Sequence, residues 1–328
     1  MRVGRAAGLT DTGRRRLRNE DAFVCDPPFF AVADGMGGAR AGEIAARLAA
    51  GALEERAAFA EGEEGVVDLI VEANRRIWDR AVADPATAGM GTTVTAALVD
   101  ETGRIALGHV GDSRAYRLRR GALEQLTTDH SLVAELVESG VLTPEEAEVH
   151  PQRSAITRAL GTEPSVEVES FTVQGEVGDV YLLCSDGLPT MLADGDVVAA
   201  IEQSGRDPVA AAEALVAAAN ARGGEDNITV VLFELEEGEP EPSAAPAVPE
   251  HAGAEEAEPE IESEIEFEIG PAAAAGGAGS ELEPSAGAAT SAGMSRHGAG
   301  KGGRAAAIAL LLAIVVLGLL ALYWGLGR

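Results

Sequence analysis

Three stretches of different chemistry divide this chain of 328 residues and limit how much of it can share one core. Residues 236–295 contain 15 glutamates and no aspartate, lysine or arginine. A tract with so much like charge and so few aromatic side chains buries too little apolar surface to fold. We therefore expect a solvated acidic linker rich in alanine, glycine and proline over 236–304, and a folded domain over 1–235.

The third stretch, residues 305–324, is a run of 20 apolar residues without a charge. At about 1.5 Å per residue, such a helix spans the roughly 30 Å hydrocarbon core of a bilayer. A buried core helix is the alternative, but the run has no polar face. Basic residues precede the run, so we expect a single-pass helix in the cell membrane, a cytoplasmic N-terminal side and a short extracytoplasmic tail over 325–328.

Charge and cysteine content narrow the class of protein. The formal net charge is −29, which argues against a nucleic-acid partner because phosphate binding needs clustered basic residues. Cys25 and Cys184 lie far apart in apolar runs, so we expect reduced thiols in a reducing compartment. Within the acidic tract, the apolar residues of 261–269 alternate with glutamate, which suits either a strand that docks elsewhere or, as we favour, an ordinary linker.

The first 235 residues alternate between strand and helix patterns. Short runs rich in β-branched and aromatic residues predict buried strands at 29–33, 94–99, 180–184 and 228–233. Helical periodicity predicts helices near 43–60, 66–83, 131–139, 196–203 and 208–221. Residues 104–126 predict two strands around 111–113 and a turn at 120–121. Because strands arrive in groups with helices between the groups, we expect an α+β sheet sandwich.

Four aspartates stand beside small or amide residues at the ends of these strands: Asp34, Asp112, Asp186 and Asp226. A strand end holds a carboxylate at the rim of a rigid sheet, where backbone and water can approach closely. Hard cations such as Mg²⁺ and Mn²⁺ require oxygen ligands of this kind. One such aspartate alone is more often a turn residue, but four in one domain predict a metal site if the fold gathers them.

Eight motifs within residues 3–235 resemble those of a known family, and this resemblance indicates which fold would gather the aspartates. They are Asp11–Asp21 (DTGRRRLRNED), Ala33–Gly38 (ADGMGG), Gly91–Thr93 (GTT), Gly111–Tyr116 (GDSRAY), Asp129–Ser131 (DHS), Ile156–Gly161 (ITRALG), Ser185–Leu188 (SDGL) and Asp226–Thr229 (DNIT). In this order they resemble the bacterial type 2C protein phosphatases, the PPM family. The resemblance implies a β-sandwich flanked by α-helices (α-β-β-α) and a metal-dependent serine/threonine phosphatase.

The resemblance also implies roles for single residues. Asp34 would bridge two Mn²⁺ or Mg²⁺ ions, Asp186 and Asp226 would complete the first site, and the Gly35 carbonyl would join the second. Asp112 with Asp186 matches a third metal site, and Glu20 and Asp21 match the acidic pair that holds metal-bound waters. The list of expected metal ligands is therefore Asp34, Gly35, Asp112, Asp186 and Asp226.

Arg16 matches the arginine that holds the substrate phosphate, a role suited to its planar pair of donors. The neighbouring arginines blur this assignment, since a basic run is usually a solvated face, but the register with Asn19–Asp21 favours Arg16. Two cations would activate a water for in-line attack on phosphorus without a phosphoenzyme. Met36 stands where animal members carry a histidine proposed as general acid, so the general acid stays unassigned here.

Three histidines within matched motifs, His109, His130 and His150, are expected to be structural rather than catalytic. Residues 139–153 correspond to the flap beside the active site of bacterial relatives. The expected substrates are phosphoserine and phosphothreonine in proteins, and the expected partner is a membrane-associated serine/threonine kinase with its substrates. Two alternatives stay open: a catalytically silent phosphoprotein-binding membrane scaffold, and a phosphatase for a sigma-factor regulatory phosphoprotein.

Overall fold

Two antiparallel sheets lie face to face in the structure, a computed structural model that describes residues 1–37 and 41–238. The first sheet has the strand order β1-β11-β10-β7-β8, and the second has the order β2-β3-β5-β6-β9 with β4 paired to β3. The strands are β1 (Arg2–Asp11), β2 (Asp21–Asp26), β3 (Phe29–Met36), β4 (Gly91–Thr92), β5 (Val94–Val99), β6 (Arg104–Val110), β7 (Arg114–Arg119), β8 (Ala122–Gln125), β9 (Glu169–Gln174), β10 (Val180–Cys184) and β11 (Ile228–Glu236).

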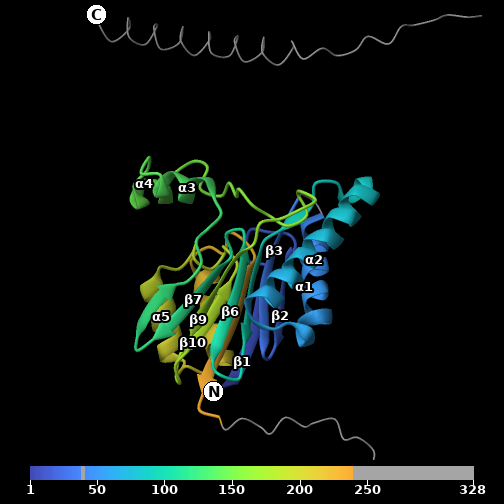
Figure 1. The fold of residues 1–328 in the computed structure, drawn as a ribbon. Helices are drawn as coiled ribbons and strands as arrows, with labels where there is room; N and C mark the ends of the chain where they lie inside the picture. Colours follow the sequence, from blue (N-terminus) through green and yellow to red (C-terminus); the bar gives the residue numbers. More distant parts are fainter. Residues whose placement is uncertain (38–40, 239–328) are drawn as a thin grey trace, which may run out of the picture. The chain divides into compact units, whose positions relative to one another are not determined.

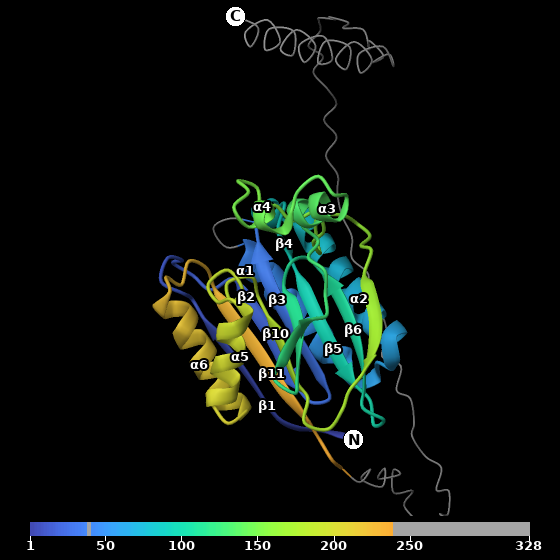
Figure 2. The ribbon, with the colours of Figure 1, turned by 90° about the vertical axis from the view of Figure 1, so that its left-hand side faces the viewer.

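Helices cover the outer face of each sheet (Figures 1 and 2). The helices α1 (Ala41–Arg56) and α2 (Gly62–Ala83) pack on the second sheet, and α5 (Asp194–Gln203) and α6 (Pro208–Ala221) lie against the first. Two short helices, α3 (Leu132–Glu138) and α4 (Pro144–Glu148), lie beyond one end of the sandwich. Short 3-10 turns occupy Ala57–Phe59 and Pro85–Thr87. This arrangement confirms the expected α-β-β-α sandwich.

Side chains on the central strands alternate between two cores. In β3, Phe29 and Ala31 face the helices α1 and α2, whereas Phe30 and Val32 face the other sheet. Both sets are buried because the strand is covered on both faces, which explains why its sequence is continuously apolar. The same alternation holds along β11.

Aromatic rings join the two sheets at the centre of the sandwich. The Phe233 ring of β11 stacks on the Phe30 ring of β3 with a centroid distance of 4.2 Å, and on the Tyr181 ring of β10 at 5.1 Å. All three side chains are fully buried. Although aromatic residues are scarce in this chain, these three are the largest fully buried side chains between the sheets within the described residues.

The sequence predicted the central strands and the five longer helices to within a few residues. It missed β1, β2, β8 and β9, which are the outer strands of the two sheets, together with the short β4 and α4. The predicted membrane span at 305–324 and the alternating segment at 261–269 lie outside the described residues. In the part of the chain that is described, none of the helices has the length and apolar character needed to cross a bilayer.

The stacked rings generate a prediction about stability. Replacing Phe233 by alanine should lower the free energy of unfolding by about 3–5 kcal/mol, because it removes the ring that both other aromatics contact and leaves a cavity. Urea unfolding followed by circular dichroism measures this loss. Phe59→Ala is the matched control, since the Phe59 side chain is 85% exposed and its removal should change little. Equal losses in the two variants would contradict the assigned core.

Candidate metal centre

Three of the predicted aspartates are carried to one end of the first sheet by its register. The last residue of β10 pairs with the first residue of β7 and with the third residue of β11. Asp186 follows β10 by two residues, Asp112 precedes β7 by two, and Asp226 precedes β11 by two. Antiparallel neighbours therefore deliver all three carboxylates to the same edge.

Asp34 comes from the second sheet, where it lies near the end of β3. Its backbone is held from both sides: its N–H donates to Thr93 Oγ1 at 3.0 Å, and its carbonyl accepts from the Thr93 N–H and from Thr92 Oγ1, both at 2.9 Å. Asp34 pairs directly across the ladder with Asp21, the first residue of β2. The strand β3 thus points its final carboxylate toward the aspartates of the first sheet.

Asp21 links the two sheets at this end. Its Oδ2 accepts hydrogen bonds from Ser185 Oγ at 2.8 Å and from Thr229 Oγ1 at 2.6 Å, both of which belong to the first sheet's side of the site. The carboxylate is almost fully buried, and its Oδ1 has no hydrogen-bond partner among the described residues. The same is true of Asp186 Oδ1. Buried oxygens without a donor are costly unless a cation or proton meets them.

The electrostatics of the cluster favour a cation. Burial raises the pKa of Asp186 to about 6, with the charge of Asp226 adding to the rise, and burial raises the pKa of Asp21 to about 7. Burial, then the charges of Asp186 and Asp129, raise the pKa of Asp112 to about 7.

The pKa of Asp34 is raised well above its usual range by burial and by the other four carboxylates, Asp21, Asp186, Asp112 and Asp226. Carboxylates that oppose each other's ionisation in this way are stabilised by divalent cations.

Glycines bring backbone oxygen to the same place. A Cβ on Gly35 would lie 2.2 Å from the Gly42 carbonyl oxygen, and a Cβ on Gly42 would lie 2.6 Å from both the Gly35 carbonyl oxygen and Glu20 Oε2. The start of α1 can therefore approach Gly35 and Glu20 only because neither glycine has a side chain. Gly42 was missed by sequence reasoning, and its place one residue inside a helix gave no signal.

The loop that carries Arg16 is pinned to the loop that carries Asp226. Arg16 Nη2 donates to Asp226 Oδ2 at 2.5 Å. The Asn227 side chain accepts from the Glu20 N–H at 2.8 Å and donates to the carbonyls of Thr12 and Arg18, each at 2.9 Å. Asn227 belongs to a matched motif, but its role as the clamp of this loop was not predicted.

The expected residues are thus brought together at one end of the sandwich, and their chemistry fits divalent cations. They offer carboxylate and carbonyl oxygens, the donors that Mn²⁺ and Mg²⁺ prefer, and two buried carboxylate oxygens have no hydrogen-bond partner within the described residues. Asp34, Asp112, Asp186, Asp226 and the Gly35 carbonyl could hold the ions, with Glu20 and Asp21 beside them.

A hollow of about 1110 Å³ opens from this cluster. Asp112 and Asp186 line it on one side, and Val137 of α3, Ala147 of α4 and Arg153 line it on another. The segment 139–153, the expected flap, therefore borders the same space as two of the predicted ligands. Arg114, also on its wall, is fixed by two hydrogen bonds of 2.8 and 2.7 Å to the Asp129 carboxylate.

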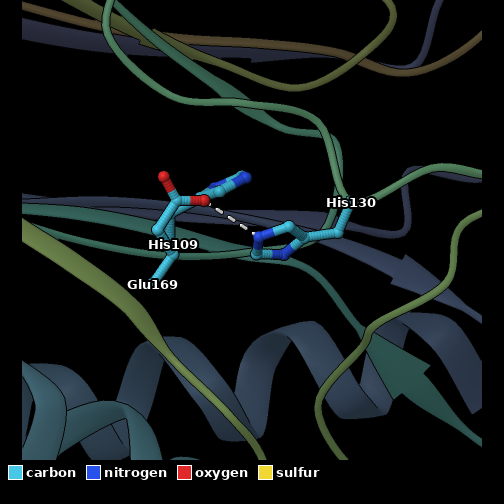
Figure 3. A group of neighbouring side chains, drawn as sticks. All are labelled: His109, His130 and Glu169. Atoms are coloured by element: carbon cyan, nitrogen blue, oxygen red, sulfur yellow. Dashed lines mark hydrogen bonds and ion pairs between the residues drawn. The ribbon is translucent and has the colours of Figure 1, made fainter. Parts of the chain in front are cut away.

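His109, His130 and Glu169 form a second group whose ligand atoms all lie within 4.8 Å of one another (Figure 3). The Thr128 carbonyl can only accept, so His109 Nε2 carries the proton that it donates at 3.1 Å, and Nδ1 meets Thr95 Oγ1 at 2.9 Å. The Gly111 N–H donates to His130 Nδ1, so His130 Nε2 donates to Glu169 Oε2 at 3.0 Å.

Every ring nitrogen in this pair thus has a hydrogen-bond partner that competes with a metal ion. Burial lowers the pKa of His109 to about 3, which keeps the ring neutral at ordinary pH. The group joins the start of the 131–157 segment to β6 and β9. His150 lies apart from this pair, and its Nδ1 accepts from the Gln152 N–H at 3.2 Å.

Comparison with known proteins agrees with this geometry. The model of the protein phosphatase 2C family matches residues 12–218. The serine/threonine phosphatase stp of Listeria welshimeri is 41% identical over 237 residues, covering 69% of this chain and 93% of that protein. The serine/threonine protein phosphatase PstP of Mycobacterium tuberculosis is 40% identical over 256 residues, covering 75% of this chain and 48% of that protein.

Solved structures give the same relationship. The crystal structure of M. tuberculosis PstP superposes with a TM-score of 0.67 at 39% identity, covering 72% of this chain and all of that one. The structure of the catalytic domain of PstP in complex with two manganese ions also gives 0.67, at 36% identity and with the same coverage. The family match, the identity over most of the chain and the shared fold together show that this chain belongs to the protein phosphatase 2C family.

Proposed function

We propose that this chain hydrolyses phosphoserine and phosphothreonine in proteins and depends on Mn²⁺ or Mg²⁺ to do so. The observation that carries the proposal is the meeting of five aspartates from both sheets at one end of the sandwich. Two of them have a buried oxygen without a hydrogen-bond partner in the part of the chain that the structure describes. Relatives that are 40% and 41% identical are named serine/threonine phosphatases, and one related structure holds two manganese ions. Both findings support the same activity.

Each predicted residue receives a role in this proposal. Asp34, Asp186 and Asp226 with the Gly35 carbonyl hold two cations, and Asp112 with Asp186 offers a place for a third. When bound, the cations supply an activated water and offset the charge that develops on the phosphoryl group. Asp21 fixes the position of the cluster through Ser185 and Thr229, and Glu20 stands beside Gly35.

Arg16 is the residue we propose for the substrate phosphate. Its guanidinium already lies at the cluster, 2.5 Å from a carboxylate oxygen of Asp226, and about half of the side chain remains exposed. A planar guanidinium with several donors can keep one hydrogen bond to Asp226 while it presents others to phosphate oxygens. The pinned backbone on either side of Arg16 holds it there before substrate arrives.

A catalytically silent phosphoprotein-binding scaffold of the same fold is the alternative from a different class. The presence of all four strand-end aspartates argues against it, because a binding module has no need of a complete cation-binding set. A phosphatase for a sigma-factor regulatory phosphoprotein keeps the chemistry and changes only the substrate. Measuring activity on a panel of phosphoserine and phosphothreonine proteins distinguishes this substrate from the broader set of phosphoproteins proposed above.

We also propose that the chain is anchored in the cell membrane with its phosphatase domain in the cytoplasm, near a membrane-associated serine/threonine kinase. The support is the uncharged apolar run 305–324 and the basic residues Arg296, Lys301 and Arg304 before it. From its sequence we expect the acidic tract 236–304 to act as a tether with a root-mean-square end-to-end distance of some 40–50 Å, at roughly 5–6 Å × √n for n residues.

Removal of one ligand tests the activity. Asp186→Asn should reduce Mn²⁺-dependent phosphate release from a phosphothreonine peptide by more than about 100-fold, because an amide replaces a charged oxygen ligand of the cluster. Phosphate is measured colorimetrically with and without Mn²⁺. Asp68→Asn, an exposed position on α2, is the matched control and should retain activity. A wild-type protein that is folded and binds Mn²⁺ yet releases no phosphate would favour the scaffold.

The raised pKa values predict how Mn²⁺ binding depends on pH. The pKa of Asp186 is raised from 3.8 to about 6 and that of Asp112 to about 7, so protonation stabilises the metal-free fold at low pH. This contribution is lost as pH rises through 6 to 7, where Mn²⁺ replaces the protons.

The increase in melting temperature on adding Mn²⁺ should therefore be large at pH 8 and shrink toward pH 5. A free Mn²⁺ concentration of 100 times the Kd adds about 2.7 kcal/mol to the free energy of unfolding. Differential scanning fluorimetry in Mn²⁺ and in EDTA measures the increase at each pH. An increase that is the same at every pH would show that Mn²⁺ binds elsewhere, and Asp186→Asn should remove most of it.

Deleting residues 305–328 tests the anchor. We expect the shortened chain to move from the membrane pellet to the supernatant of fractionated cells, because the apolar run is removed, while phosphate release persists. Immunoblotting of the two fractions measures the change. A chain that stays in the pellet after the deletion would contradict the proposed anchor.

A further inference from the structure

The loop around Arg16 carries two arginines for which the proposed reaction has no role. Arg14, Arg15, Arg16 and Arg18 lie within five consecutive residues of a chain whose net charge is −29. Arg16 forms an ion pair with Asp226, and Arg14 forms one with Asp11, with 3.6 Å between Arg14 Nη1 and Asp11 Oδ1. Among the residues that the structure describes, Arg15 and Arg18 form no ion pair, although most of the other arginines do. Two positive charges are therefore left open beside the metal centre.

The loop is exposed but its path is fixed. The backbone N–H groups of Arg14 and Arg15 donate to the Gly224 carbonyl at 2.7 and 3.2 Å, and the Arg18 carbonyl accepts from Asn227. Only glycine fits at position 13, because a Cβ there would lie 2.1 Å from the Asp226 carbonyl oxygen. The Leu17 side chain at the apex is 99% exposed, so none of the described residues covers the loop.

The chain itself keeps Arg15 and Arg18 close to Arg16. Consecutive α-carbons are about 3.8 Å apart, so both residues start within about 8 Å of the Arg16 α-carbon. An extended peptide advances about 3.4 Å per residue. With the phosphate of a substrate on Arg16, the side chains one to three positions from the phosphorylated residue would therefore pass the two open arginines.

We propose that Arg15 and Arg18 bind acidic side chains next to the phosphorylated residue, so that this enzyme prefers phosphorylation sites flanked by aspartate or glutamate. The inference rests on the proposed phosphatase function and names the class of substrate. The domain as a whole is acidic and repels such peptides, and the two open arginines of residues 14–18, the arginine loop, offset this repulsion beside the metal centre.

Two phosphothreonine peptides that differ only in their flanks test the proposal on the full-length protein. One carries glutamate on both sides of the phosphothreonine, and the other carries glutamine at the same positions. We expect kcat/KM to favour the glutamate peptide by about 2- to 10-fold, as two exposed ion pairs allow. The ratio should fall toward 1 in the double variant Arg15→Gln, Arg18→Gln and at high ionic strength.

Arg56→Gln is the matched control, because Arg56 is exposed, forms no ion pair within the described part of the chain and ends α1 about 20 Å along the helix from Gly42. It should leave the ratio unchanged. The charge-reversed double variant Arg15→Glu, Arg18→Glu should prefer a peptide flanked by lysine. Equal ratios in the wild type and both double variants would overturn the proposal.

A binding measurement distinguishes failure of this proposal from failure of the proposed phosphatase function. If none of the peptides is hydrolysed, fluorescence anisotropy of the same labelled peptides still reports whether the wild type prefers acidic flanks. Sedimentation with phosphatidylserine and phosphatidylcholine vesicles tests the other anionic partner. If the double variant loses its preference for phosphatidylserine and keeps its peptide ratio, the loop binds lipid and the proposal is wrong.

Discussion

A buried carboxylate that belongs to one sheet and is held by the other fixes the geometry of this site. Asp21 begins β2, and the only hydrogen bonds that its carboxylate accepts among the described residues come from the hydroxyls of Ser185 and Thr229 on the opposite side of the sandwich. A charge placed so deeply is expensive unless its surroundings compensate it. The two hydroxyls do so in part, and they tie Asp21, which pairs with Asp34 in the second sheet, to Ser185, the neighbour of Asp186 in the first.

The sandwich and the cluster therefore depend on each other. The stacked rings of Phe30 and Phe233 hold the sheets together at the centre, while at the rim the same sheets bring together carboxylates that raise one another's pKa. Burial of apolar surface holds the two sheets together against the electrostatic repulsion between their carboxylates, and divalent cations relieve that repulsion. A site built in this way binds cations because the fold, rather than the ion, brings the ligands together.

How much the sequence predicted follows from where each strand lies. The strands β3, β5, β10 and β11 are central and covered on both faces, so they appear as continuous apolar runs. The strands β1, β2, β8 and β9 are outer strands. Polar residues or glycines interrupt β1, β8 and β9, and the apolar run of β2 is only four residues long, so none of them has a long apolar run. The aspartates were predictable because each one lies within two residues of an end of a recognisable strand.

The supporting contacts could not be predicted from residue type alone. Gly42 matters because Gly35 and Glu20 approach it from distant parts of the chain, and Asn227 matters because its amide joins Thr12, Arg18 and Glu20. These contacts make the arginine loop an extension of the metal centre rather than a free surface loop. A loop fixed to the Asp226 segment by its backbone can place charge beside a substrate with little loss of conformational entropy on binding. In the proposed arrangement, recognition and catalysis share one set of rigid supports, so changing Arg15 and Arg18, but not Arg16, should alter recognition without disturbing catalysis.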